Sequence, residues 1–175
     1  MEQKLNGIAG LNILYLRPGY FMENTLGQVG IIHALGKIAA PLLENLRLPM
    51  IATRDIGEFA ANALQDLKFT GKQTRELLGQ RDLTYNEATA IIGKAIDKPN
   101  LQYVQMAAEQ IRPAMLQIGM SGNIADLILE MSAALNSGYM GALEKRSSEN
   151  TTPTSFETFV KEQFLPVYEG KQQAA

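Results

Sequence analysis

Residues 11–24 read L-N-I-L-Y-L-R-P-G-Y-F-M-E-N, and this stretch decides how the rest of the chain is organised. Its first part, residues 11–16, is almost continuously apolar, which predicts a strand buried on both faces, as in parallel α/β sheets. Residues 17–19 (Arg-Pro-Gly) are predicted to stop this strand, because proline cannot donate to a ladder and glycine permits a sharp change of direction. Ligands of open α/β sheets bind outside the carboxyl ends of the strands. Residues 18–24 are therefore the first place to expect a site.

The composition narrows the class of protein. The chain has 175 residues, of which 46% are hydrophobic, and this suits one domain over residues 1–175. A net charge of −2 gives no broad electrostatic case for binding nucleic acid. The lack of cysteine excludes disulfides, thiolate metal sites and a cysteine nucleophile, and it fits a cytoplasmic protein; a single histidine excludes a multi-histidine metal centre. No apolar run is long enough to span a bilayer, and the N-terminus lacks a signal-peptide pattern, so no membrane partner is expected.

Helices and strands alternate in the first part of the chain. Asp55, with Glu58 three positions later, is predicted to cap a helix. Thr84 and Glu87 are predicted to form a capping box at the start of another helix, which ends before Pro99 because proline disfavours a helical residue before it. The other predicted elements are helices over residues 2–8 and 25–35 and strands over residues 37–43, 48–53, 73–78 and 101–105.

The last part of the chain is predicted to be helical. Apolar residues recur at helical spacing over residues 107–118 and 123–136, and a polar surface loop follows at residues 145–153. Thr154 and Glu157 are predicted to form a second capping box. The final helix turns its apolar side chains inward, and residues 170–175 form a frayed tail. These inward side chains are Phe156, Phe159, Val160 and Phe164. The whole pattern predicts an α/β fold with a helix-rich C-terminal part.

Residues 16–24, L-R-P-G-Y-F-M-E-N, resemble the signature of the NmrA-like family, whose members are atypical short-chain dehydrogenases and NAD(P)-binding regulators. Other segments are similar to the family in the same order along the chain, and the resemblance covers essentially all of it. These segments are residues 49–57, 82–87, 101–104 and 154–168. The resemblance implies a partial Rossmann-like parallel sheet with a helix-rich, substrate-binding C-terminal part.

One part of the family pattern is missing from this sequence. Family members begin with a strand, a G-x-x-G-x-x-G turn and a helix, which together bind the dinucleotide pyrophosphate. Here the glycines form only G-x-x-G pairs, at residues 7–10, 27–30 and 119–122, and none is predicted to follow a strand and open a helix. The family residues that read the ribose also fall before Met1. The resemblance therefore implies the C-terminal, substrate-side portion of such a protein, truncated before its cofactor half, with weak or absent binding of NADP or NAD and no turnover alone.

The resemblance assigns site residues within residues 18–24, and it assigns neither a catalytic residue nor a metal ligand. Four residues match the family segment near the nicotinamide end of the cofactor, and two would face the substrate pocket. The alternative is that the aromatic residues and the methionine are core packing after the strand end. The cofactor-binding candidates are Pro18, Gly19, Tyr20 and Phe21, and the substrate-binding candidates are Met22 and Asn24.

Other residues are candidates from their own chemistry. Arg17 could pair with a phosphate or a carboxylate, although a structural role at the sheet edge is favoured. The single histidine, His33, is expected to be a structural residue with its hydrogen bonds satisfied. Tyr103 and Tyr139 could line a cleft. Asp55 is explained by its predicted capping role.

Three functional hypotheses follow. The resemblance implies an NAD(P)H-dependent oxidoreductase that passes a hydride to a small quinone, dye or carbonyl acceptor held over residues 20–24. The alternative is a redox-sensing module that binds another protein through residues 107–168. The third hypothesis is that the reading frame is truncated, so that the strand at residues 11–16 lacks a neighbour on one side. The exposed apolar edge would then favour a homodimer or aggregation, or mark a missing N-terminal half.

Overall fold

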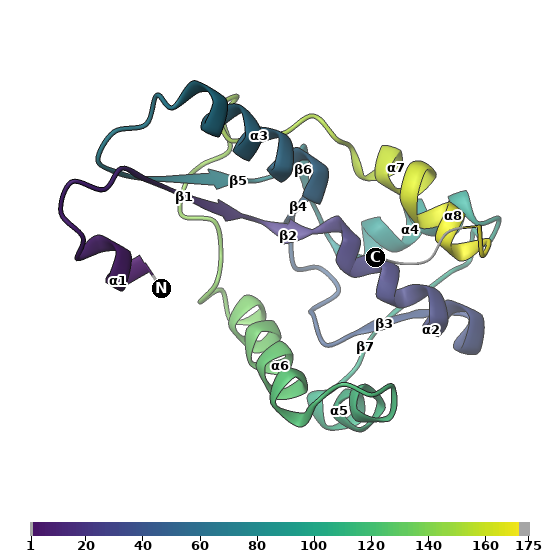
Figure 1. Ribbon diagram of the computed structural model, residues 1–175. Helices are drawn as coiled ribbons and strands as arrows, with labels where there is room; N and C mark the ends of the chain where they lie inside the picture. The colour runs from purple at the N-terminus through teal and green to yellow at the C-terminus, as the bar shows by residue number, and fades with distance from the viewer. Residues whose placement is uncertain (1, 172–175) are drawn as a thin grey trace.

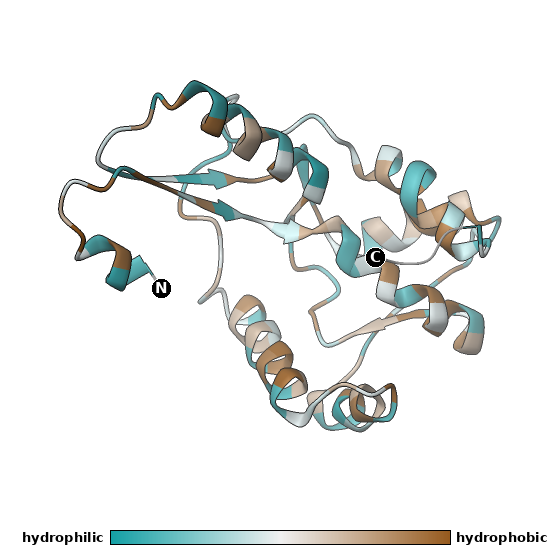
Figure 2. Cartoon of the chain, in the orientation of Figure 1, coloured by the Kyte–Doolittle hydropathy of each residue, from teal (hydrophilic) through white to brown (hydrophobic). Residues whose placement is uncertain are grey.

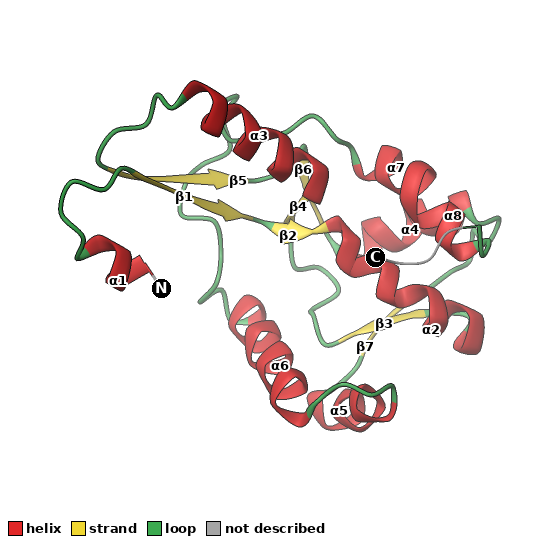
Figure 3. Ribbon diagram, viewed as in Figure 1, coloured by secondary structure: helices red, strands yellow, loops and turns green. Residues whose placement is uncertain are grey.

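The computed structural model describes residues 2–171, and these form a mixed α/β fold (Figures 1 and 3). The strands form three small sheets with the orders β1-β5, β2-β4-β6 and β3-β7. Every pair is parallel except β4 with β6. The strands are β1 (Ile13–Pro18), β2 (Tyr20–Phe21), β3 (Ile38–Ala40), β4 (Leu48–Ile51), β5 (Lys72–Leu77), β6 (Arg81–Leu83) and β7 (Tyr103–Gln105). The predicted α/β class with a parallel sheet is confirmed.

Helices surround these sheets, and the last three form one continuous run with a π-helical centre. Within residues 2–171, no helix is both long and apolar enough to cross a membrane. The helices are α1 (Glu2–Asn6), the 3-10 helix η1 (Met22–Gly27), α2 (Gln28–Leu35), α3 (Thr53–Asp66), α4 (Tyr85–Ala95), α5 (Ala108–Gln117), α6 (Gly122–Asn136), α7 (Phe156–Phe159), the π-helix η2 (Val160–Phe164) and α8 (Leu165–Tyr168). The predicted tail at residues 170–175 lies mostly outside the described residues.

The hydrophobic core lies where β4, η1, α2 and α4 meet the run from α7 to α8. The C-terminal run contributes three phenylalanines that are at most 1% exposed, as the sequence predicted. They are Phe156, Phe159 and Phe164. Apolar residues of β4 and α4, including Met50 and Ile92, close the core from the other side. The end of the chain is therefore an integral part of the fold.

The predicted end of the first strand at residues 17–19 is confirmed, because β1 ends at Pro18 and the next strand begins at Tyr20. Pro18 is still in register with Leu77 of β5, and the Gly19 N–H donates to the Leu77 carbonyl over 2.8 Å. The chain then runs on into β2, which lies end to end with β1 (Figure 1). A Cβ on Gly19 would lie 2.2 Å from the Pro49 carbonyl oxygen, so the close approach of β2 to β4 explains the glycine.

The expected burial of the first strand on both faces is wrong. Every residue of β1 is half-buried except the exposed Arg17. Within the described chain, β1 pairs with β5 only, and the first half of β5 is itself exposed. A strand with one neighbour in a two-stranded sheet gains less cover than a central strand does.

One of the three predicted caps forms as expected. The Thr84 Oγ1 accepts a hydrogen bond from the Glu87 N–H over 3.1 Å, and the Glu87 carboxylate accepts one from the Thr84 N–H over 2.8 Å. This is the predicted capping box at the start of α4. It fixes the backbone direction at Tyr85, the first residue of the helix.

The other two caps are wrong, because their residues bind each other. Helix α3 begins at Thr53, and Asp55 is buried in its first turn. Helix α7 is capped by Ser155, whose Oγ accepts from the Thr158 N–H over 3.1 Å. The Asp55 carboxylate instead accepts from the Thr154 N–H over 3.0 Å and from the Thr154 hydroxyl over 2.5 Å. This contact ties α3 to the start of the C-terminal run.

Candidate functional site

Residues 18–24 pass the carboxyl end of β1, form β2 and then enter η1. They therefore lie at the carboxyl ends of two parallel pairs, β1–β5 and β2–β4. Ligands bind at this edge in open α/β sheets. The local geometry shows what each predicted site residue does there.

Tyr20 and Asn24 are brought together with a third residue, Tyr85. The Tyr20 and Tyr85 hydroxyl oxygens lie 2.8 Å apart, and their rings meet edge to face with centroids 6.2 Å apart. The Asn24 side chain lies close enough to Tyr20 to lower the pKa of the Tyr20 hydroxyl. We call these three residues the tyrosine–asparagine cluster. Tyr85 was not predicted from the sequence, because its partner lies 65 positions away and no local pattern marks the pair.

Tyr103 supports this cluster from inside the core. Its ring stacks on Tyr85 with centroids 4.9 Å apart. Its hydroxyl donates to the carbonyl oxygens of Ala40, over 3.1 Å, and Leu42, over 2.5 Å. Tyr103 is only 8% exposed, so it packs in the core and does not line an open cleft.

The three tyrosines are neutral over the physiological pH range. Burial raises the pKa of Tyr20, against the lowering effects of its hydrogen bond with Tyr85 and of the nearby Asn24 side chain. Burial raises the pKa of Tyr85 well above its usual value, and the neighbouring Tyr20 adds to this. Burial likewise raises the pKa of Tyr103 beyond the usual range of a phenol. The cluster therefore offers neutral hydroxyl and amide groups, which exchange hydrogen bonds and carry no charge.

The residues that follow Tyr20 have different surroundings. Phe21 is 38% exposed, whereas Met22 is 1% exposed and belongs to the hydrophobic core. The position of Met22 is what the core-packing alternative predicts, and its role toward a substrate stays a prediction. The Glu23 carboxylate accepts from the Thr53 N–H over 2.9 Å and from the Thr53 hydroxyl over 2.7 Å. Glu23 therefore serves the start of α3.

Two other candidates have structural contacts. The Arg17 guanidinium donates twice to the Glu2 carboxylate, over 3.3 and 2.7 Å, and so joins β1 to α1. The His33 ring stacks on Tyr168 with centroids 4.5 Å apart, and its Nε2 lies 3.1 Å from the Tyr168 carbonyl oxygen. Both observations agree with the structural roles expected from the sequence. Tyr139 is 88% exposed.

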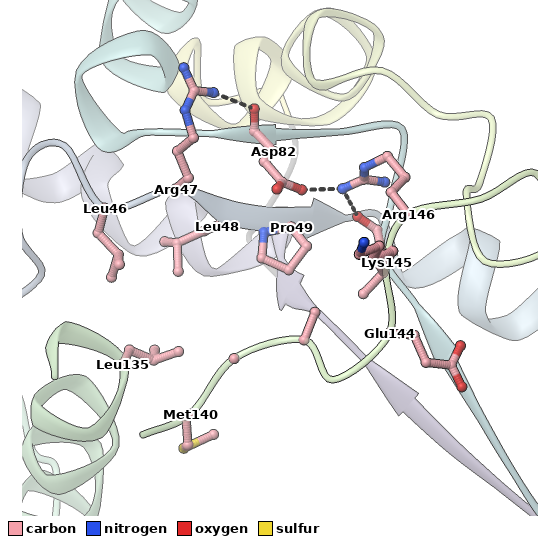
Figure 4. A pocket seen from close by; sticks show the side chains of 13 residues that line it. Leu46, Arg47, Leu48, Pro49, Asp82, Leu135, Met140, Glu144, Lys145 and Arg146 are labelled. Carbon is pink, nitrogen blue, oxygen red and sulfur yellow. Dashed lines mark hydrogen bonds and ion pairs between the residues drawn. The ribbon is translucent and has the colours of Figure 1, made fainter. Parts of the chain in front are cut away.

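A pocket of about 290 Å³ lies between the start of β4, strand β6 and residues 140–146 (Figure 4). We call it the slot. Its lining is apolar along two sides and charged at one end, where Arg146 pairs with Asp82. The residues that define it below are Leu46, Leu48, Leu135, Met140, Lys145 and Arg146. The slot was not predicted from the sequence, because residues 145–153 have the composition of a polar surface loop.

The described residues do not fit the pyrophosphate of a dinucleotide. A pyrophosphate cradle requires a glycine-rich turn from a strand into a helix. Within residues 2–171, the pair at residues 7–10 follows α1, the pair at 27–30 joins η1 to α2, and the pair at 119–122 joins α5 to α6. Gly19 does not supply a cradle either, because the Pro49 carbonyl oxygen occupies the space beside it.

Comparison with known proteins gives a consistent result. The profile of the NmrA-like family matches residues 9–160. The chain is 29% identical over 168 residues to the prestalk A differentiation protein A of Dictyostelium discoideum, covering 94% of this chain and 54% of that protein. It is 31% identical over 137 residues to the NAD(P)H azoreductase of Xenophilus azovorans, covering 77% of this chain and 46% of that protein.

Solved structures share the fold. An NADPH-dependent quinone oxidoreductase from Escherichia coli, complexed with NADPH, superposes with a TM-score of 0.75 at 20% identity, covering 93% of this chain and 57% of that one. The negative transcriptional regulator NmrA in complex with NADP superposes with a TM-score of 0.68 at 16% identity, covering 97% and 57%. The chain thus spans about half the length of the proteins that it matches.

Proposed function

This chain belongs to the NmrA-like family, and from that premise we propose that it forms the acceptor-side part of an NAD(P)H-dependent oxidoreductase. Two of the similar proteins, the azoreductase and the quinone oxidoreductase, support the class of reaction. The acceptor is then a small, flat, electron-poor molecule such as a quinone. Its binding residues are those that match the family signature, residues 18–24.

The observation that carries this proposal is the tyrosine–asparagine cluster at the carboxyl end of β2. Tyr20 and Tyr85 share a hydrogen bond of 2.8 Å beside an apolar core, and the exposed Asn24 amide lies near Tyr20. A neutral acceptor that carries oxygen or nitrogen atoms suits such surroundings, because a few placed polar groups in an apolar site fix its orientation. Tyr85 is a positioning residue here, since it acts through Tyr20.

The first test measures cofactor binding. NADPH and NADH are titrated into the purified chain by calorimetry, beside a size-exclusion run. We expect weak or undetectable binding and no turnover by this chain alone, because it holds no glycine-rich turn for the pyrophosphate. Tight binding would contradict this part of the proposal and would point to a cradle formed by other means, for example in a dimer.

The second test measures acceptor binding without a dinucleotide. Binding of 1,4-naphthoquinone is followed by chemical-shift changes of the backbone amides. We expect Asn24→Ala to weaken binding several-fold, while Asn123→Ala on the exposed start of α6 leaves it unchanged. Equal binding by the two variants would sink the assignment of residues 18–24.

A second candidate function, a protein-binding regulatory module, is supported by the surface of α5 and α6. Figure 2 shows hydrophobic positions along α6, and several of its apolar side chains and those at the end of α5 are exposed. Among them are Ile118 at 80%, Leu127 at 52% and Ile124 at 47%. Exposed apolar patches mark interaction sites. A partner captured by the native chain but lost by Leu127→Glu, and retained by Asn24→Ala, would favour this function over the enzyme.

A further inference from the structure

The slot has the size and shape of a small-molecule site. Its volume of about 290 Å³ falls at the lower end of the range of about 300–1,000 Å³ for such sites, which suits one or two rings. Figure 4 shows Leu46 and Leu48 on one side and Leu135 and Met140 on the other. Two apolar walls that face each other accept a flat hydrocarbon body, and a methionine sulfur makes favourable contacts with aromatic rings.

The wall formed by residues 140–146 is held in place by the protein itself. The buried Glu76 carboxylate of β5 accepts hydrogen bonds from the N–H groups of Leu143, over 3.0 Å, and Glu144, over 2.7 Å. The Arg146 guanidinium donates to the Leu78 carbonyl oxygen over 3.0 Å and also to the Gly79 carbonyl oxygen. A wall anchored at both of these points needs little ordering when a ligand enters.

The charges at the slot leave an excess of positive charge. Asp82 is neutralised by its ion pair with Arg146. The Glu144 side chain points away from the slot in Figure 4. Lys145 lines the slot, is exposed, and has no ion pair with any other residue in the described part of the chain. Arg47 also lines the slot, but it pairs with the Glu87 carboxylate over 3.5 Å, so Lys145 supplies the excess charge.

We propose that the slot binds a small planar organic anion, an aromatic carboxylate of one or two rings. The rings lie between the walls formed by Leu48 and Met140, and the carboxylate faces Lys145. This site uses none of the residues of the tyrosine–asparagine cluster and needs no dinucleotide, so it stands whether or not the chain takes part in hydride transfer.

The experiment titrates 2-naphthoate into the full chain and measures binding by calorimetry and by the chemical shift of the Met140 methyl group. We expect saturable binding that moves this methyl signal, and binding at least fivefold weaker for the neutral 2-naphthamide. Lys145→Gln should weaken naphthoate binding by about five- to tenfold, as expected for a contact with a charged group. Lys4→Gln, which removes an exposed lysine of α1 outside the slot, should leave it unchanged.

A second variant tests the location independently of charge. Ala142 lines the slot and is exposed, so Ala142→Phe should fill the slot without disturbing the fold, and naphthoate binding should be lost. Thermal unfolding of both variants confirms that they fold. Absence of saturable binding by the native chain would overturn the proposal. If Ala142→Phe still binds naphthoate, the anion binds elsewhere and the proposed location is wrong. If Lys145→Gln binds naphthoate as tightly as the native chain, the proposed charge contact is refuted.

Discussion

Two regions of this molecule differ in how completely they are packed. In the closed region, η1, α2, β4 and α4 surround the run from α7 to α8, and its phenylalanines are at most 1% exposed. In the open region, β1 is mostly half-buried, the first half of β5 is exposed, and α5 and α6 leave apolar side chains exposed. Leu127 on α6 is 52% exposed, for example. We therefore expect the closed region to contribute most of the stability, whereas the open region presents exposed apolar side chains to solvent.

This difference explains where the candidate sites lie. The tyrosine–asparagine cluster stands where β2 leaves the open sheet and enters the closed core, so Tyr85 and Tyr103 can fix Tyr20 from inside. The slot lies where β4 of the closed region faces residues 140–146 that follow α6 (Figure 4). Both sites lie at the boundary between the two regions, where buried side chains adjoin exposed ones.

The largest expected difference between the closed and the open region comes from shortening one side chain in each. Phe159→Ala in the closed core should lower the free energy of unfolding by about 3–5 kcal/mol, because it leaves a cavity among fixed neighbours. Leu127→Ala on α6 should change it by less than about 0.5 kcal/mol, as is usual for exposed sites. Urea unfolding followed by circular dichroism measures both. Similar losses for the two variants would show that α6 is covered in solution.

The contact between α3 and the C-terminal run should have the next largest effect. Asp55→Asn places an amide N–H₂ against donors, so the buried Thr154 N–H and hydroxyl lose an acceptor. We expect a loss of about 1.5–3 kcal/mol in urea unfolding, the range for hydrogen bonds to a charged group. Asp126→Asn on α6 removes an exposed carboxylate that pairs with Arg112 and should change stability little. Equal free energies of unfolding for the two variants would show that the buried contact between Asp55 and Thr154 does not stabilise the fold.

Two glycines test the approach of β2 to β4. A Cβ on Gly19 would lie 2.2 Å from the Pro49 carbonyl oxygen, so Gly19→Ala must push the strands apart. We expect a loss of about 1–3 kcal/mol, as for an overpacked core. Gly27 has a helical backbone and no atom within 4 Å of an added Cβ, so Gly27→Ala should be neutral or stabilising by up to about 1 kcal/mol. Thermal melts of the pair report the difference, and a neutral Gly19→Ala would mean that β2 does not pack against β4 as described.

The smallest expected effect concerns alkaline pH. Burial raises the folded-state pKa of Tyr20, Tyr85 and Tyr103, so these phenols stay protonated in the fold and ionise in the unfolded chain. Their contribution to stability is therefore complete below the unfolded pKa of about 10 and is lost as the pH rises above it. Absorbance at 295 nm should show these ionisations only as the protein unfolds. Tyr85→Phe should reduce the loss of stability at high pH and cost about 1 kcal/mol at pH 7. Ionisation of all six tyrosines before unfolding would contradict the raised pKa values of Tyr20, Tyr85 and Tyr103.

Much of the fold follows from local patterns. Helix α6 has apolar residues at helical spacing, and the capping box at Thr84 is complete within four residues. Strand β6 (Arg81–Leu83) escaped prediction because a three-residue strand that contains two charged residues has no apolar pattern. It exists because it pairs with β4. The contact of Asp55 with Thr154 was not predicted for the opposite reason. The sequence around Asp55 is typical of a helix cap, whereas its actual partner lies 99 positions away.

The sequence by itself determined the α/β class, the order of most elements and the family signature at residues 16–24, because periodicity, capping and turn chemistry act between near neighbours. The tertiary structure decided the roles of Tyr85, Asp55 and Gly19. Each of these roles depends on a contact or a cavity formed by residues far apart in the chain. Contacts of this kind come from the packing of whole elements, and no local pattern of residues encodes them.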